Sequence, residues 1–145
     1  MHPYPHHYHV AAHATNTGSV TLSSDGLVDL ASAPPREFDG PGDQWSPETL
    51  LLAAVADCFV LSFRAVAAAS KFDWLALQCR TSGTLDRLER VAQFTEITHT
   101  VTLDVPVGAS VERAQSLLQK AEQVCLVSNS LKPGVHVVAD IRNAG

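Results

Sequence analysis

Residues 46–59 read SPETLLLAAVADCF and predict the start of a long buried helix. Ser46 is a favourable N-cap, and Pro47 suits the first helical position because its missing N–H would have no helical partner there. From residue 49 to 69 the segment is apolar on nearly all sides, which is typical of a helix buried all round. A small domain can hardly bury such a helix alone, so we expect two copies of the chain to pack these helices together.

The flanking sequence predicts short strands and a second helix. Strands are expected over residues 8–13, 20–22 and 27–30, with a turn at 24–26, and the Pro- and Gly-rich residues 33–46 predict a loop. Further strands are expected over 77–86, 97–105 and 135–141, and the clearest period-two alternation lies at 97–105. Ser110 is the expected cap of a second helix that ends near Cys125. This order predicts an α+β fold of mainly antiparallel sheets with both helices against one face.

Length and composition argue against several classes of protein. A chain of 145 residues predicts a single domain over 1–145, and a net charge of −5 with scattered basic residues argues against a nucleic-acid partner. Charged residues within the apolar helix argue against a membrane span, and the polar first residues show no signal peptide. We therefore expect a cytoplasmic protein, in which a disulfide is more often catalytic than structural.

Three cysteines are the first candidates for chemistry. Cys58 is either a small core residue or a reactive thiol, and a reactive thiol needs a cationic or hydrogen-bonding partner to hold its thiolate. Cys125 falls at a helix C-terminus, where the helix dipole disfavours a thiolate, so it is either a packing residue or a resolving thiol that attacks after Cys58 has been oxidised. Cys79 has the inward parity of its strand and is interpreted as structural.

A carboxylate and an arginine are the candidate partners of Cys58. Glu48 lies ten residues before Cys58, about 15 Å along a straight helix, so it would reach this thiol only from a partner helix or through Arg36. The alternative is that Glu48 only favours the helix N-terminus electrostatically. Arg36 is preferred to Arg64 as the cationic group, because Arg64 falls on a different face of the helix from Cys58.

Histidines form the remaining group. A cluster at the N-terminus could bind a divalent metal, although a solvated first strand is the simpler interpretation, and no metal site is assigned. Its members are His2, His6, His7 and His9. His99 lies on the buried parity of its strand and is interpreted as a core histidine with satisfied hydrogen bonds.

Two motifs resemble a known family. Ser-Pro-Glu-x-Leu-Leu-x-Ala-x-x-x-x-Cys-Phe (46–59) and Ala-Glu-x-x-Cys-x-x-Ser-x-Ser (121–130) are similar to those of the OsmC/Ohr family, the osmotically inducible and organic hydroperoxide resistance proteins. The resemblance covers nearly the whole chain, which looks closer to the general OsmC-like branch. It implies an intertwined homodimer with its two sites at the subunit interface. It further implies reduction of organic hydroperoxides by a cysteine pair without metal or other cofactor, with regeneration by an external dithiol such as a lipoylated protein.

The resemblance also suggests roles for individual residues. Cys58 falls where the family has its peroxide-attacking thiol, Cys125 where it has its resolving thiol, and Glu48 on the site glutamate. Some members carry the site arginine in a Gly-rich turn near the first hairpin, but that turn here, residues 15–19, reads TNTGS. Arg36 is the nearest substitute.

Three hypotheses follow. The first is a thiol peroxidase of the oxidative stress response, in which Arg36 stabilises the thiolate, Glu48 holds the arginine, and an apolar lining favours organic peroxides. The expected lining residues are Trp45, Leu51, Leu52, Phe59 and Phe63. The second is a non-enzymatic protein that binds a small apolar ligand or senses oxidation, and the third is metal binding by the N-terminal histidines.

Overall fold

The computed structural model describes residues 1–144 and divides into two compact units, Met1–Leu50 and Leu51–Gly145. The first unit holds a three-stranded antiparallel sheet of β1 (Ala11–His13), β2 (Val20–Ser23) and β3 (Leu30–Ser32), in that order. The predicted turn is present, since the Leu27 N–H donates to the Ser24 carbonyl at 3.0 Å and Gly26 has a φ of 76°. The loop after β3 contains a short 3₁₀ helix, η1 (Arg36–Phe38).

The long helix α1 covers Pro47–Ala69, close to its predicted bounds. Ser46 is its N-cap, because the Ser46 hydroxyl accepts the N–H of Thr49 at 3.1 Å. The helix buries one stripe of side chains at intervals of four residues: Val55, Phe59, Phe63 and Ala67.

The expectation that α1 is buried on all sides is wrong for a single chain. Leu61, on another face, is 50% exposed, because the one sheet that α1 packs against covers only one stripe. By length and composition alone α1 could cross a membrane, a test that the core helix of a globular protein also passes.

The second unit is built on the sheet of β4 (Ala76–Leu88), β5 (Val91–Val105) and β6 (Val135–Asn143), with β5 in the centre. β4 and β5 are antiparallel, and β5 and β6 are parallel. The parallel pair, which the sequence analysis did not predict, follows from α2 (Val111–Val124), which lies between β5 and β6 and carries the chain back to the starting end of the sheet. The sheet is therefore mixed within an α+β fold.

The β4–β5 hairpin is longer than the sequence analysis predicted. Glu89 and Arg90 form its turn, with φ values of 50° and 70°. A two-residue turn of this kind needs positive φ at both positions and is usually marked by Asn or Gly. Because neither residue type occurs here, the sequence contains no signal for the turn.

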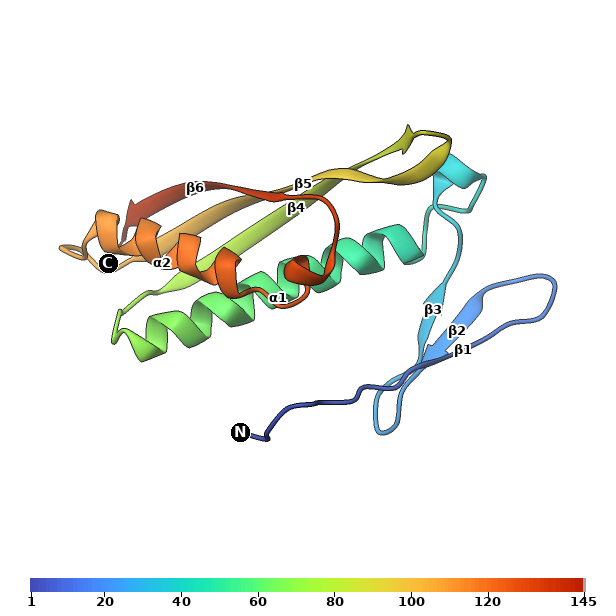
Figure 1. The fold of residues 1–145 in the computed structure, drawn as a ribbon, viewed down its shortest axis with the longest axis horizontal. Helices are drawn as coiled ribbons and strands as arrows, with labels where there is room; N and C mark the ends of the chain where they lie inside the picture. Colours follow the sequence, from blue (N-terminus) through green and yellow to red (C-terminus); the bar gives the residue numbers. More distant parts are fainter. Residues whose placement is uncertain (145) are drawn as a thin grey trace. The chain divides into compact units, whose positions relative to one another are not determined.

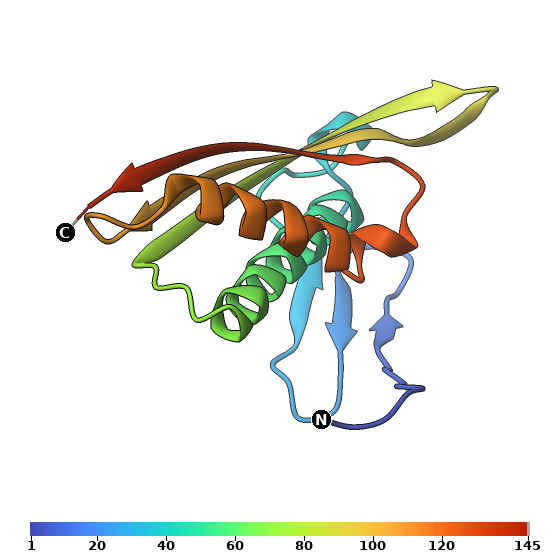
Figure 2. The same ribbon diagram turned by 60° about the vertical axis from the view of Figure 1, so that its left-hand side comes forward.

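Both helices of the second unit cover the same face of its sheet (Figures 1 and 2). The core between them joins the α1 stripe to inward side chains of β5 and to one face of α2. Its buried members are Phe59, Phe63, Ala67, Phe72, Val101, Leu103, Val105, Ala114, Leu118 and Ala121. This packing fixes where the C-terminal end of α2 lies relative to α1.

The cap of α2 offers a local test of its stability. The Ser110 hydroxyl accepts the N–H of Arg113 at 3.1 Å, so Ser110→Ala should lower the free energy of unfolding by about 1 kcal/mol. Ser116→Ala is the matched control, because Ser116 is an exposed residue within α2 where alanine is a better helix former. Urea unfolding followed by circular dichroism measures both variants, and equal stability of the two would contradict the assigned cap.

Candidate functional site

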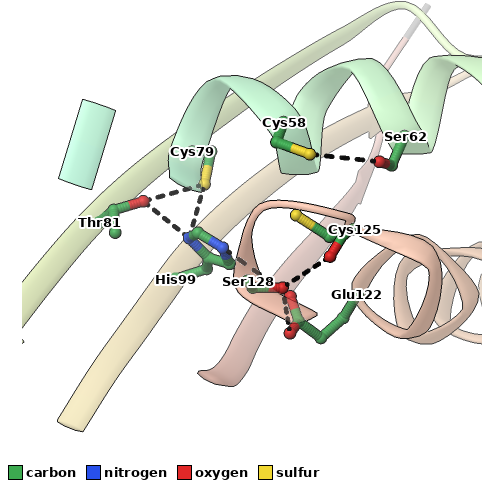
Figure 3. A network of polar contacts seen from close by, with 8 residues as sticks. All are labelled: Cys58, Ser62, Cys79, Thr81, His99, Glu122, Cys125 and Ser128. Atoms are coloured by element: carbon green, nitrogen blue, oxygen red, sulfur yellow. Dashed lines mark hydrogen bonds and ion pairs between the residues drawn. The ribbon is translucent and has the colours of Figure 1, made fainter. Parts of the chain in front are cut away.

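Two free thiols from different elements meet in the second unit. Cys58 lies in α1, and Cys125 is the residue directly after α2. In Figure 3 the Cys58 side chain lies above that of Cys125, and Cys58 is close enough to contribute to the raised pKa of the Cys125 thiol. Cys58 is half-buried and also lies 4.0 Å from the Ser62 hydroxyl, whereas Cys125 is fully buried. Residues 67 positions apart in the sequence are thus adjacent in space.

The segment after α2 wraps around the Cys125 thiol. A short 3₁₀ helix, η2 (Ser128–Ser130), follows it, and Ser128 is buried. Burial raises the pKa of the Cys125 thiol above its usual range, and the nearby Cys58 raises it further. The hydroxyl and the backbone N–H of Ser128 oppose this rise in pKa, because both stabilise the thiolate by hydrogen bonding. The net result is a pKa of the Cys125 thiol that is raised by its burial.

A buried histidine lies beside these thiols. His99 of β5 is fully buried, as predicted, and packs against the Phe59 ring with the ring centroids 4.7 Å apart. Its Nδ1 lies 2.7 Å from the Thr81 hydroxyl and 3.3 Å from the Cys79 sulfur. Its Nε2, however, is buried without a hydrogen-bond partner, so the expectation of a fully satisfied core histidine is correct for only one of its two nitrogens.

Glu122 faces the free nitrogen of His99. Its Oε2 lies 3.9 Å from His99 Nε2 and has no hydrogen-bond partner either, while its Oε1 accepts the Ser128 hydroxyl at 3.2 Å. Burial raises the pKa of the Glu122 carboxyl, and the hydrogen bond from Ser128 partly offsets that rise. The sequence analysis quoted Glu122 and Ser128 in a motif but gave them no role, since α2 periodicity does not reveal what they face.

The contact between Cys79 and His99 is not an activated thiol–imidazole pair. Burial raises the pKa of the Cys79 thiol and lowers the pKa of His99 to about 4, so both groups are neutral at pH 7. An ion pair would need the opposite shift in each group. Cys79 therefore keeps the structural interpretation that its strand parity predicted.

The structure brings Cys58 and Cys125 together, while Glu48 and Arg36 belong to the first unit. Glu48 lies in the first turn of α1, and its Oε1 is buried without a hydrogen-bond partner in the described part of the chain. Arg36 begins η1, and its exposed side chain lies against Gly42, where a Cβ would come within 2.0 Å of Arg36 Nε. Arg64 is exposed on α1.

An apolar groove of about 200 Å³ lies in the second unit. It is lined by Leu51, Gln93, Phe94, Ile97, Leu131, Lys132 and Pro133. Of the lining that the sequence analysis expected, Leu51 is present, but Phe59 and Phe63 are fully buried in the core and cannot line an accessible site. Helical periodicity could not separate these positions, because every face of α1 is apolar.

Metal ligands are not assembled in the described residues. Within residues 1–144 no three His, Cys, Asp or Glu side chains are grouped so that they could hold a metal ion. The N-terminal histidines are exposed, and His6 instead stacks on Tyr4 with the ring centroids 4.7 Å apart.

Buried His99 should make the free energy of unfolding depend on pH. Because the pKa of His99 is lowered from 6.5 to about 4, the unfolded chain binds a proton first as the pH falls. The stability due to neutral His99 is fully present above pH 6.5, and about 2 kcal/mol of it should be lost between pH 7 and pH 5. Denaturant unfolding at several pH values measures this effect. As the pH falls, His99→Asn should lose less of its free energy of unfolding than the wild type.

Glu122 should change the pH dependence of stability in the direction opposite to that of His99. Its raised pKa favours proton uptake by the folded protein, so folding gains stability as the pH falls through that pKa. In Glu122→Gln the free energy of unfolding should therefore fall more steeply on acidification than in the wild type. An unchanged slope in both variants would show that neither group titrates differently in the folded protein.

Comparison with known proteins identifies relatives of the same fold. The family model for OsmC-like proteins matches residues 40–140. An organic hydroperoxide resistance protein of Xanthomonas axonopodis pv. citri is 34% identical over 133 residues, which cover 87% of the chain and 89% of that protein. The uncharacterized protein YmaD of Bacillus subtilis is 29% identical over 137 residues, or 91% of each chain.

Solved structures agree with this relationship. The crystal structure of an organic hydroperoxide resistance protein OsmC from Legionella pneumophila superposes with a TM-score of 0.75 at 27% identity, covering 96% of this chain and 98% of the other. The α+β arrangement of two helices and two sheets is therefore shared along almost the whole length. The family match, the relatives and the fold together establish that this chain belongs to the OsmC/Ohr family.

Proposed function

We propose that the protein is a thiol-dependent peroxidase that reduces organic hydroperoxides, with Cys58 as the attacking thiol and Cys125 as the resolving thiol. The adjacency of these two free thiols is the observation that carries the proposal. The half-buried Cys58 is the more accessible of the two, and the buried Cys125 is held at the end of α2. Relatives named organic hydroperoxide resistance proteins support the substrate class.

The reaction divides into two steps. The Cys58 thiolate attacks the distal oxygen of the hydroperoxide, the O–O bond breaks, and the alcohol leaves with a proton while Cys58 becomes a sulfenic acid. The Cys125 sulfur then attacks the Cys58 sulfur, forming the disulfide and releasing water. An external dithiol, such as a protein-bound dihydrolipoamide, reduces the disulfide by thiol–disulfide exchange and restores both thiols.

The apolar groove supports a preference for organic over hydrogen peroxide. Leu51 and Phe94 present apolar surface that an alkyl tail would bury. Each buried methylene contributes about 0.8 kcal/mol of binding free energy, and hydrogen peroxide has none. A cytoplasmic location remains a prediction, in keeping with thiols that must be reduced between turnovers.

Glu48 and Arg36 are proposed to complete the site across a homodimer interface. Ten residues of helix place Glu48 about 15 Å from Cys58 along the axis of α1, too far for contact within one helix. The uncovered apolar surface of α1 supports a dimer, and the buried unpartnered Glu48 Oε1 is suited to bond a guanidinium. In this scheme Arg36 stabilises the Cys58 thiolate and orients the peroxide, and Glu48 holds Arg36.

Single-cysteine variants test the order of the thiols. With tert-butyl hydroperoxide, Cys58→Ser should lose the fast phase of thiol oxidation in stopped-flow measurements. Cys125→Ser should keep that phase but stop as a sulfenic acid that dimedone traps. Cys79→Ser is the control and should retain both steps, since Cys79 is the structural thiol.

Two outcomes would contradict the proposal. Equal, slow thiol loss in the wild type and Cys58→Ser would end the assignment of Cys58. A wild type that consumes a single equivalent of peroxide in the presence of excess dihydrolipoamide would instead support a redox sensor or ligand-binding protein.

Mixed dimers test whether Glu48 acts across the interface. Glu48→Gln and Cys58→Ser should each be inactive as homodimers. If Glu48 serves the partner's Cys58, a heterodimer of the two variants contains one intact site, so mixing after mild unfolding should restore activity to about a quarter of the wild-type value for statistical exchange. No recovery, despite heterodimers visible in native mass spectrometry, would place Glu48 and Cys58 of one chain in the same site.

A further inference from the structure

We propose that Glu122 is the proton acceptor of the resolving step, acting through the hydroxyl of Ser128 on the Cys125 thiol, and that His99 positions Glu122. This inference rests on the proposed function, because it concerns how Cys125 closes the disulfide with oxidised Cys58. Glu122 and Ser128 are positioning and proton-transfer residues here, since neither is required to touch the peroxide.

The Ser128 hydroxyl has both the Cys125 thiol and the Glu122 carboxyl group as neighbours. The Ser128 hydroxyl donates to Glu122 Oε1 at 3.2 Å (Figure 3), and it lies close enough to the Cys125 thiol to lower the pKa of that thiol. It also lies 3.1 Å from the Cys125 carbonyl oxygen, which fixes its position over the end of α2. A hydroxyl placed in this way can pass its proton to a carboxylate as it takes one from a thiol.

The second carboxyl oxygen of Glu122 faces a histidine nitrogen, and neither atom has a hydrogen-bond partner. Glu122 Oε2 and His99 Nε2 are both buried, lack hydrogen-bond partners and lie 3.9 Å apart. His99 cannot turn this nitrogen elsewhere, because its Nδ1 is engaged by Thr81 and its ring packs on Phe59. Leaving two such atoms unpaired in the interior destabilises the folded protein. A proton shared between them would remove that cost, so the pair can accommodate either charge state of the Glu122 carboxyl group.

Cys125 needs such a base more than Cys58 does. It is fully buried at the C-terminus of α2, where both desolvation and the helix dipole oppose a thiolate. The titratable groups around it come from every element packed there: Cys58 on α1, Cys79 on β4, His99 on β5 and Glu122 on α2. Of these, Glu122 is the one whose carboxyl group accepts a hydrogen bond from the Ser128 hydroxyl at the end of α2, and burial raises its pKa and so makes it a better proton acceptor.

The step balances with these groups and solvent water. The Cys125 proton moves to the Ser128 oxygen while the Ser128 proton moves to Glu122. The Cys125 sulfur uses its freed electron pair to form the S–S bond, and the S–O bond of the Cys58 sulfenic acid breaks. The departing hydroxide takes one proton from solvent and leaves as water, and Glu122 afterwards returns its proton to solvent, so no net charge is created.

Glu122→Gln tests the path because it keeps the shape of the side chain and removes the base. After one equivalent of tert-butyl hydroperoxide, sulfenic acid formation at Cys58 should proceed at the wild-type rate. Disulfide closure, measured by alkylation quench and mass spectrometry, should slow by about 10²-fold. Glu112→Gln is the matched control, because Glu112 is an exposed carboxylate in the first turn of α2, and it should close the disulfide normally.

The pH dependence separates a base from a purely structural residue. In the wild type the closure rate should vary little with pH near neutrality, whereas in Glu122→Gln it should rise about tenfold per pH unit as hydroxide replaces the missing base. Ser128→Ala breaks the same path at a different atom. The double variant should therefore be no slower than the slower single variant.

Each result has a definite meaning. Normal closure in Glu122→Gln, or parallel pH profiles, would overturn the role of Glu122 while leaving the peroxidase proposal intact. Failure of the wild type to form a sulfenic acid at Cys58 would instead overturn the peroxidase proposal itself. If Glu122→Gln does not fold, the pH profile of Ser128→Ala decides alone, because a steep profile supports the path and a flat one refutes it.

Discussion

The packing of Phe59 and Phe63 against the inner face of the β4–β5–β6 sheet is the interaction on which the geometry of the thiols depends. Each phenyl group is fully buried and contributes about 1.5–3 kcal/mol, so a rotation of α1 about its axis would be costly. Cys58 directly precedes Phe59 and is therefore held at one angle around the helix. The same core also holds α2, whose end carries Cys125, so a single apolar contact determines where both sulfurs lie.

Buried polar groups lie beside this core, next to the thiols. His99 and Glu122 place unpaired buried atoms next to the thiols, at a cost that apolar residues of similar size would avoid. Local departures from good packing and full hydrogen bonding are typical of functional positions, where they are retained for what they do. Their position beside Cys125, rather than elsewhere in the core, is what connects the burial pattern to disulfide chemistry.

Several elements could be predicted because their signals are local. Ser46 and Ser110 cap helices by bonds to backbone groups three residues away, and the alternation at 97–105 reports the two faces of one strand. Sequence patterns did not predict features that depend on contacts between residues far apart in the chain. The apolar surface of α1 carried no mark of which stripe would be buried, and the parallel pairing of β5 with β6 depends on the path of α2.

By itself the sequence determined the α+β class, the helix boundaries and the identity of the two motif cysteines, because caps, periodicity and motif spacing are properties of neighbouring residues. Only the tertiary structure decided that Cys58 lies beside Cys125 and that Glu122 faces His99. These pairs come from α1, α2 and β5, and their adjacency results from burying apolar faces together. No local pattern encodes it, since each helix could present the same residues to a different partner.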